Sequence, residues 1–119
     1  MYPNGINVIS HFSGIGGAVV ALHRLGIPLK NVVSVEPSEV NRNIIRRWWE
    51  QTNQEGNLIE VKDVQDLGPD QLENLVRSVG GFDLIIGGSP CKNFSGNYFI
   101  VLYDYSRILV DVKCVMQEQ

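Results

Sequence analysis

Hydrophobic residues in this chain form short continuous runs, and between these runs they recur every three or four positions. Short apolar runs predict buried strands, and the wider spacing predicts amphipathic helices. The predicted strands occupy residues 6–11, 31–36, 58–61 and 82–86. The predicted helices occupy residues 16–25, 37–50 and 68–79, with a fourth around residues 105–112. This alternation predicts an α/β fold with a parallel sheet and helices on both faces.

Glycine, proline and serine mark the predicted helix ends. Gly26 and Gly80 fit C-terminal stops, and Ser38 fits a helix N-terminus. On the second helix the predicted apolar side carries Val40, Ile44, Ile45 and Trp48, whereas Arg42, Arg46 and Arg47 lie elsewhere. We interpret these arginines as a solvated face, with phosphate contact as the less favoured alternative.

Length and composition indicate one globular domain or part of one, because the 119 residues are 44% hydrophobic and 19% charged. No apolar run is long enough to span a membrane, and the first residues lack the features of a signal peptide. Cys91 and Cys114 have neither metal-ligand spacing nor a disulfide framework. The net charge of −3 argues mildly against a stand-alone nucleic-acid binder.

A glycine-rich segment, Phe12-Ser13-Gly14-Ile15-Gly16-Gly17, lies between the first predicted strand and the first predicted helix. Glycines permit positive φ and close approach of a ligand, and helix N-termini favour carboxylates or phosphates. The dinucleotide pattern G-x-G-x-x-G is not met, because its third glycine is missing. The segment by itself fits a ligand loop and a merely tight turn equally well.

Acidic residues follow the second and third predicted strands. Glu36 is placed to accept hydrogen bonds from ribose hydroxyls, or it is an exposed loop carboxylate. Asp63 is placed to accept from an adenine amino group, or it caps a turn or helix. Together they predict an adenosine-bearing ligand across the strand ends, either a dinucleotide or a nucleoside cofactor without phosphate. The missing third glycine favours the nucleoside cofactor.

Cys91 follows the fourth predicted strand, in the loop Gly87-Gly88-Ser89-Pro90-Cys91-Lys92. A cysteine is commonly a small buried hydrophobe. Here it faces the same predicted edge of the sheet, where Lys92 would favour the thiolate. A thiolate beside an adenosyl cofactor suggests covalent catalysis.

In order and spacing these residues resemble the first four motifs of the DNA cytosine-5 methyltransferases. The matching segments are residues 12–17, Glu36, Asp63-Val64 and Ser89-Pro90-Cys91. Residues 20–25, 41–44, 49–54 and 81–91 are similar to the plant domains-rearranged methyltransferases. The resemblance covers about residues 6–96 and resumes at residues 104–109.

The resemblance implies a Rossmann-like S-adenosylmethionine-dependent methyltransferase fold, DNA as substrate and residence in the nucleus. Glu36 would bind the ribose, and Asp63 with Val64 would bind the adenine. Cys91 would attack C6 of a flipped cytosine, in a loop shaped by Pro90. The adenosyl and methionine parts of the cofactor would be held by Phe12, Ser13, Gly14, Ile15, Gly16 and Gly17.

Other parts of the family pattern are absent from the sequence: the Glu-Asn-Val motif, the arginine-bearing motif and a target-recognition segment. The loop after Cys91 also looks shortened. We therefore expect residues 1–119 to be the cofactor-binding and nucleophile-bearing part of an incomplete fold. Its four-strand sheet would leave an open edge, so we expect association or marginal stability.

Two alternatives to a DNA methyltransferase region remain. One is a catalytically inactive truncated relative that binds the cofactor or a partner methyltransferase chain. The other is an RNA cytosine-5 methyltransferase.

Overall fold

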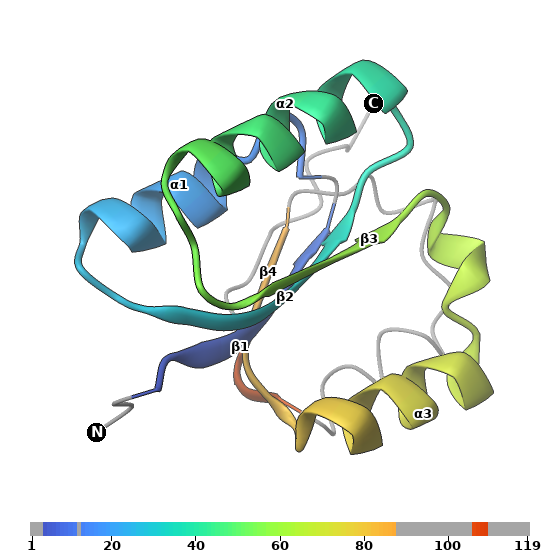
Figure 1. Ribbon diagram of the computed structural model, residues 1–119. Coiled ribbons are helices and arrows are strands. Elements are labelled where there is room, and N and C mark those ends of the chain that lie inside the picture. The colour runs from blue at the N-terminus through green and yellow to red at the C-terminus, as the bar shows by residue number, and fades with distance from the viewer. Residues whose placement is uncertain (1–3, 12, 88–105, 110–119) are drawn as a thin grey trace, which may run out of the picture.

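The computed structural model describes residues 4–11, 13–87 and 106–109. Within these ranges five parallel strands form one sheet in the order β3-β2-β1-β4-β5, which places β1 at the centre (Figure 1). In chain order the elements are β1 (Ile6–His11), α1 (Gly17–Arg24), β2 (Leu29–Val35), α2 (Glu39–Gln51), β3 (Asn57–Val61), the 3-10 helix η1 (Val64–Asp66), α3 (Pro69–Val79), β4 (Phe82–Gly87) and β5 (Ser106–Leu109).

Helices cover both faces of the sheet: α1 and α2 lie on one face and α3 on the other (Figure 1). The central strand alternates between the two cores. Val8 packs with α1 and α2, and its neighbour Ile9 packs with α3; both are 0% exposed. Burial on both faces explains why the strands read as continuous apolar runs. The predicted α/β architecture is confirmed.

The predicted helix around residues 105–112 is wrong over residues 106–109, which form β5. Ser106 pairs with Phe82 and Ile108 with Leu84, in parallel register. Without β5 the outer side of β4 would present unpaired backbone N–H and C=O groups. Pairing with that edge outweighs the local spacing of apolar residues. The sheet therefore has five strands where four were predicted, with β3 and β5 at the edges of the described part.

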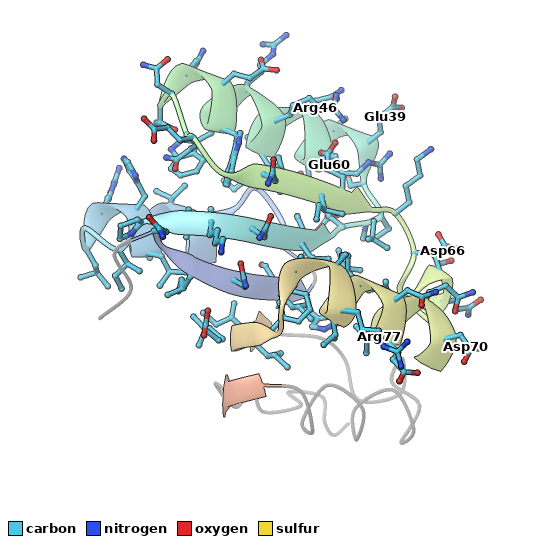
Figure 2. All side chains as sticks on the ribbon, turned by 60° about the horizontal axis from the view of Figure 1, so that its bottom comes forward. Glu39, Arg46, Glu60, Asp66, Asp70 and Arg77 are labelled. Atoms are coloured by element: carbon cyan, nitrogen blue, oxygen red, sulfur yellow. The ribbon has the colours of Figure 1, made fainter. Side chains whose placement is uncertain are left out.

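The face that α2 presents to the sheet differs from the prediction. Val40 and Ile44 are 68% and 42% exposed, whereas Ile45 and Trp49 are buried. Arg42 is also buried, so its assignment to a solvated face is wrong, while Arg46 and Arg47 are exposed as predicted. Figure 2 shows Arg46 on α2 beside Glu60 on β3, where Arg46 Nη2 lies 2.6 Å from Glu60 Oε1.

A row of amides crosses the amino-terminal part of the sheet. Asn57 Nδ2 donates to Asn31 Oδ1 over 3.0 Å, and Asn31 Nδ2 donates to Asn7 Oδ1 over 2.9 Å. Asn7 Nδ2 in turn donates to the carbonyl of Val79, the last residue of α3, and to that of Gly81, two residues further on. The three asparagines are in register on β1, β2 and β3. This row joins three strands to the end of α3 and fixes their relative positions.

Candidate functional site

The glycine turn begins directly after β1, at the carboxyl end of the central strand. Gly14 and Gly16 have φ values of 59° and 94°, a region that favours glycine. Gly16 caps α1, and its N–H donates to the Ser13 carbonyl over 2.9 Å. Strand order reverses between β1 and β4, and ligands of such sheets bind outside the strand ends at this point.

The glycines of the turn differ in what surrounds them. A Cβ at Gly16 would lie 3.1 Å from Ile45 Cγ1 on α2, so Gly16 allows α1 and α2 to pack closely. A Cβ at Gly14 or Gly17 would meet nothing within 4 Å. Gly14 and Gly17 therefore border open space at the strand ends, while Gly16 borders the core.

Three serine hydroxyls anchor the turn to the sheet. Ser34 Oγ on β2 donates to Ser13 Oγ over 2.9 Å. Ser13 Oγ lies 3.0 Å from both the carbonyl and the hydroxyl oxygen of Ser10 on β1. Ser10 and Ser34 are buried. The Ser13 hydroxyl thus points into the sheet, which leaves the main chain of the turn as its ligand-facing part.

Glu36 follows β2 and connects the turn to α2. Its Oε1 accepts from the Gly14 N–H over 2.7 Å. Its Oε2 accepts from the Ser38 N–H over 2.9 Å and from Asn41 Nδ2 over 3.3 Å. Glu36 is 5% exposed, so the alternative of an exposed loop carboxylate is wrong. The structure brings together two features that the sequence placed far apart, the glycine turn and the acid after β2.

The start of α2 supports Glu36 through Ser38, which was predicted only as a helix N-terminus, and through Asn41 and Arg42, which the sequence analysis did not select as site residues. Ser38 caps the helix by accepting from the Asn41 N–H. Arg42 Nη1 donates to the carbonyls of Glu36 and Pro37 over 2.9 and 2.8 Å. The only sequence signal for these roles is that Asn41 and Arg42 lie in the first turn and a half of a helix that follows an acid.

Asp63 lies after β3 and forms a turn. Its Oδ1 accepts from the Gln65 N–H, and its carbonyl accepts from the Asp66 N–H, each over 2.9 Å. The side chain is exposed, and Val64 begins η1. The Glu36 N–H donates to the Val61 carbonyl over 2.9 Å, which sets the end of β3 beside Glu36. The turn role is thus present, and the adenine role stays a prediction.

The remaining predicted residues, Phe12, Pro90 and Cys91, lie outside the described residues. The end of β4 is described, and Gly87 pairs with His11 at the end of β1. His11 is 3% exposed, and its burial lowers the pKa of the imidazole from 6.5 to about 4. Sequence analysis treated His11 only as part of a strand.

A cavity of about 510 Å³ lies at the amino-terminal ends of the strands, beside the residues that begin β2 and β3. Its lining includes Pro28, Lys30, Gln54 and Asn57. None of the predicted site residues that the structure describes lines it. We place the candidate site at the carboxyl edge because the glycine turn and Glu36 meet there. None of the described helices has the length and apolar character needed to cross a membrane.

Two solved structures with a similar fold are methyltransferases. One is a tRNA (uracil-54, C5)-methyltransferase from Pyrococcus abyssi in complex with S-adenosyl-L-homocysteine, with a TM-score of 0.55 and 21% identity, over 85% of this chain and 22% of that chain. Another is an S-adenosylmethionine-dependent methyltransferase from Clostridium acetobutylicum, with a TM-score of 0.55 and 16% identity, over 84% of this chain and 38% of that chain. At these identities the likeness shows the fold alone, and it confirms the predicted Rossmann-like methyltransferase fold.

Sequence relatives are closer. The chain is 54% identical over 127 residues to the DNA (cytosine-5)-methyltransferase DRM2 of Oryza sativa, covering 98% of this chain and 21% of that protein. It is 51% identical over 128 residues to DRM2 of Arabidopsis thaliana, covering 98% and 20%. The chain thus spans about a fifth of the length of these relatives.

A third relative, from Oryza sativa, is described as a probable inactive DNA (cytosine-5)-methyltransferase, DRM3. It is 46% identical over 127 residues, covering 98% of this chain and 18% of that protein. The family model for C-5 cytosine-specific DNA methylases matches residues 6–97. With most of its length matched in this way, the chain belongs to the C-5 cytosine-specific DNA methylase family.

Proposed function

We propose that this chain binds S-adenosylmethionine at the carboxyl edge of β1 and β2 and is the cofactor-binding and nucleophile-bearing part of a DNA (cytosine-5) methyltransferase. The observation that carries this proposal is the 2.7 Å hydrogen bond from the Gly14 N–H to Glu36 Oε1. It joins the glycine turn to a buried carboxylate at the point where ligands of such sheets bind.

The described residues fit an adenosyl cofactor. Open space beside Gly14 and Gly17 leaves room for a ligand against the main chain. Glu36 supplies a carboxylate for the ribose hydroxyls, since Oε1 accepts only the bond from Gly14 and keeps a lone pair for a hydroxyl, whereas Oε2 already accepts from Ser38 and Asn41. Asp63 with Val64 would border the adenine. Phe12, Ser13, Ile15 and Gly16 would complete the turn that holds the cofactor.

The proposed chemistry uses Cys91. Bound S-adenosylmethionine would supply the activated methyl group, with S-adenosylhomocysteine as the product. The Cys91 thiolate adds to C6 of a flipped cytosine, and the electron pair gained by the ring makes C5 the nucleophile that takes the methyl group. A base then removes the C5 proton, the C6–S bond breaks and the thiolate returns. Pro90 would fix the loop. With DNA as its substrate, the chain would act in the nucleus.

The test is methyl transfer by the full chain from radiolabelled S-adenosylmethionine to a cytosine-containing DNA duplex. Cys91→Ser removes the proposed nucleophile, and Cys114→Ser is the matched control. If residues 1–119 transfer methyl groups without the absent motifs, label enters DNA with the wild type and Cys114→Ser and none enters with Cys91→Ser; no label with any of the three favours an inactive relative. Equal transfer by Cys91→Ser would contradict the covalent mechanism.

A second candidate function is that of an inactive relative that binds the cofactor or a partner methyltransferase. It is supported by the similarity to DRM3 of Oryza sativa and of Arabidopsis thaliana, both described as probable inactive. The alignment with the Oryza sativa DRM2 also extends over 127 residues against the 119 of this chain, so the relative has residues without a counterpart here. Cofactor binding without methyl transfer to DNA or to an RNA control would favour this function.

A further inference from the structure

Arg42 is a buried cation whose charge has no anionic partner in the described part of the chain. The residue is 8% exposed. The salt bridges found there join other residues, Arg46 with Glu60 and Arg77 with Glu73. Burying a charge without a partner is unfavourable unless hydrogen bonds compensate it. The compensation here comes from two main-chain carbonyls, those of Glu36 and Pro37.

These two carbonyls belong to the link between β2 and α2. β2 ends at Val35 and α2 begins at Glu39, so neither carbonyl lies within a strand or a helix. The Arg42 N–H donates to the Ser38 carbonyl over 2.9 Å, which anchors the arginine in the first turn of α2. From this position its side chain reaches back across the link.

Arg42 thereby completes the set of contacts that hold Glu36. The Glu36 N–H donates to Val61, and the Glu36 carbonyl accepts from Arg42, so both peptide groups of this residue are fixed. With its main chain fixed, the carboxylate can accept from Gly14 and Asn41 at the same time. Without the guanidinium, the link between β2 and α2 would be free to move. The Glu36 carboxylate would then no longer be held in one direction.

We propose that Arg42 is the positioning residue that aims the Glu36 carboxylate at the ribose hydroxyls of the cofactor. This inference rests on the proposed function, because it assumes that Glu36 meets an adenosyl ligand. Arg42 touches no ligand in this proposal and acts through the main chain of Glu36 and Pro37.

The test compares Arg42→Met and Arg42→Lys with Arg47→Met in the full chain. Arg47 is an exposed arginine on the same helix and is the matched control. Two ligands are titrated by calorimetry: S-adenosylhomocysteine and its analogue without ribose hydroxyls. In the ligand-free protein, hydrogen exchange of the Gly14 amide reports whether Glu36 still accepts its bond. Circular dichroism at the assay temperature identifies folded variants.

We expect Arg42→Met to weaken S-adenosylhomocysteine binding about tenfold, which corresponds to the loss of one hydrogen bond with a charged donor. We expect less than about twofold weakening for the analogue, faster exchange of the Gly14 amide, and an intermediate loss for Arg42→Lys, which keeps the charge. Arg47→Met should match the wild type. If Arg42→Met does not fold, Arg42→Lys carries the same comparison.

Equal weakening for both ligands in a folded Arg42 variant, or unchanged affinity for S-adenosylhomocysteine, would overturn the role of Arg42 alone. Absence of binding by a folded wild-type chain would overturn the proposed function, and the ribose role of Arg42 with it.

Discussion

Gly16→Ala is the substitution within the glycine turn for which the structure predicts a clear loss of stability. Gly16 has φ 94° and ψ 25°, and an added Cβ would lie 3.1 Å from Ile45 Cγ1. The left-handed conformation costs an alanine about 1–2 kcal/mol, and crowding against a packed side chain adds about 1 kcal/mol. Reduced freedom of the unfolded chain offsets about 0.5 kcal/mol. We expect a net loss of about 2 kcal/mol.

The neighbouring Gly17→Ala is the matched control. Gly17 is the first residue of α1 and is exposed, and an added Cβ would meet nothing within 4 Å. Alanine is the better helix former, so we expect unchanged stability or a gain of about 0.5 kcal/mol. The added methyl group would occupy space that we assign to the cofactor. Gly17→Ala should therefore weaken S-adenosylhomocysteine binding without destabilising the fold.

Urea and thermal unfolding, followed by circular dichroism and tryptophan fluorescence, measure both effects. A loss of about 2 kcal/mol lowers the melting temperature by roughly 8 °C for a domain of this size. A Gly16→Ala variant as stable as Gly17→Ala would refute the argument from backbone conformation and packing.

Three further predictions concern buried polar groups. Asn31→Leu leaves amide groups on both neighbouring strands without a partner; we expect a loss of about 2 kcal/mol in urea unfolding, with unchanged cofactor affinity. Ser34→Ala removes the donor to Ser13; we expect a loss of about 1 kcal/mol and a several-fold weaker affinity for S-adenosylhomocysteine by calorimetry, whereas equal affinity would contradict the anchoring role. Burial lowers the pKa of His11 to about 4, so the unfolded chain binds the proton more tightly. Stability should therefore fall by about 3 kcal/mol as pH falls from about 6.5 to about 4. His11→Gln should reduce the change in the free energy of unfolding over this pH range. An unchanged dependence of that free energy on pH would contradict the assignment to His11.

Most of the fold could be predicted because local and tertiary preferences agree in the first four strands. The apolar runs of β1 and β2 are buried on both faces, and the helix stop predicted at Gly80 is a C-cap with φ 82°. The strand at residues 106–109 could not be predicted in the same way. Its assignment depends on the free edge of β4, which is distant in sequence.

The orientation of α2 shows where a helical pattern is insufficient. Val40 and Ile44 fit an apolar side with Ile45, but they are exposed, and Arg42 is buried instead. The rotation of the helix is set by contacts at its start, where Ser38 caps it and Arg42 binds the preceding carbonyls. The Ser38 cap has a residue-type signal and was predicted, but the bonds of Arg42 go to main-chain carbonyls, which leave no pattern of residue types in the sequence.

The candidate site could be predicted in part for a related reason. Strand ends placed the glycine turn, Glu36 and Asp63 at one edge of the sheet, and the structure has that arrangement. The burial of Glu36 and its bond to Gly14 depend on a turn from another part of the chain. Asp63 fits a turn and a ligand contact equally well in sequence, because its side chain can bond to its own backbone.

The central claim is that Glu36 and the glycine turn form a cofactor site, and its most direct test is calorimetric titration of the full chain with S-adenosylhomocysteine. Glu36→Gln removes the charge of the buried carboxylate, and Glu39→Gln removes an exposed charge three residues further along. The account predicts binding by the wild type and Glu39→Gln, with affinity reduced about tenfold or more by Glu36→Gln. Absence of binding by a folded wild-type chain, or equal binding by all three proteins, would contradict it.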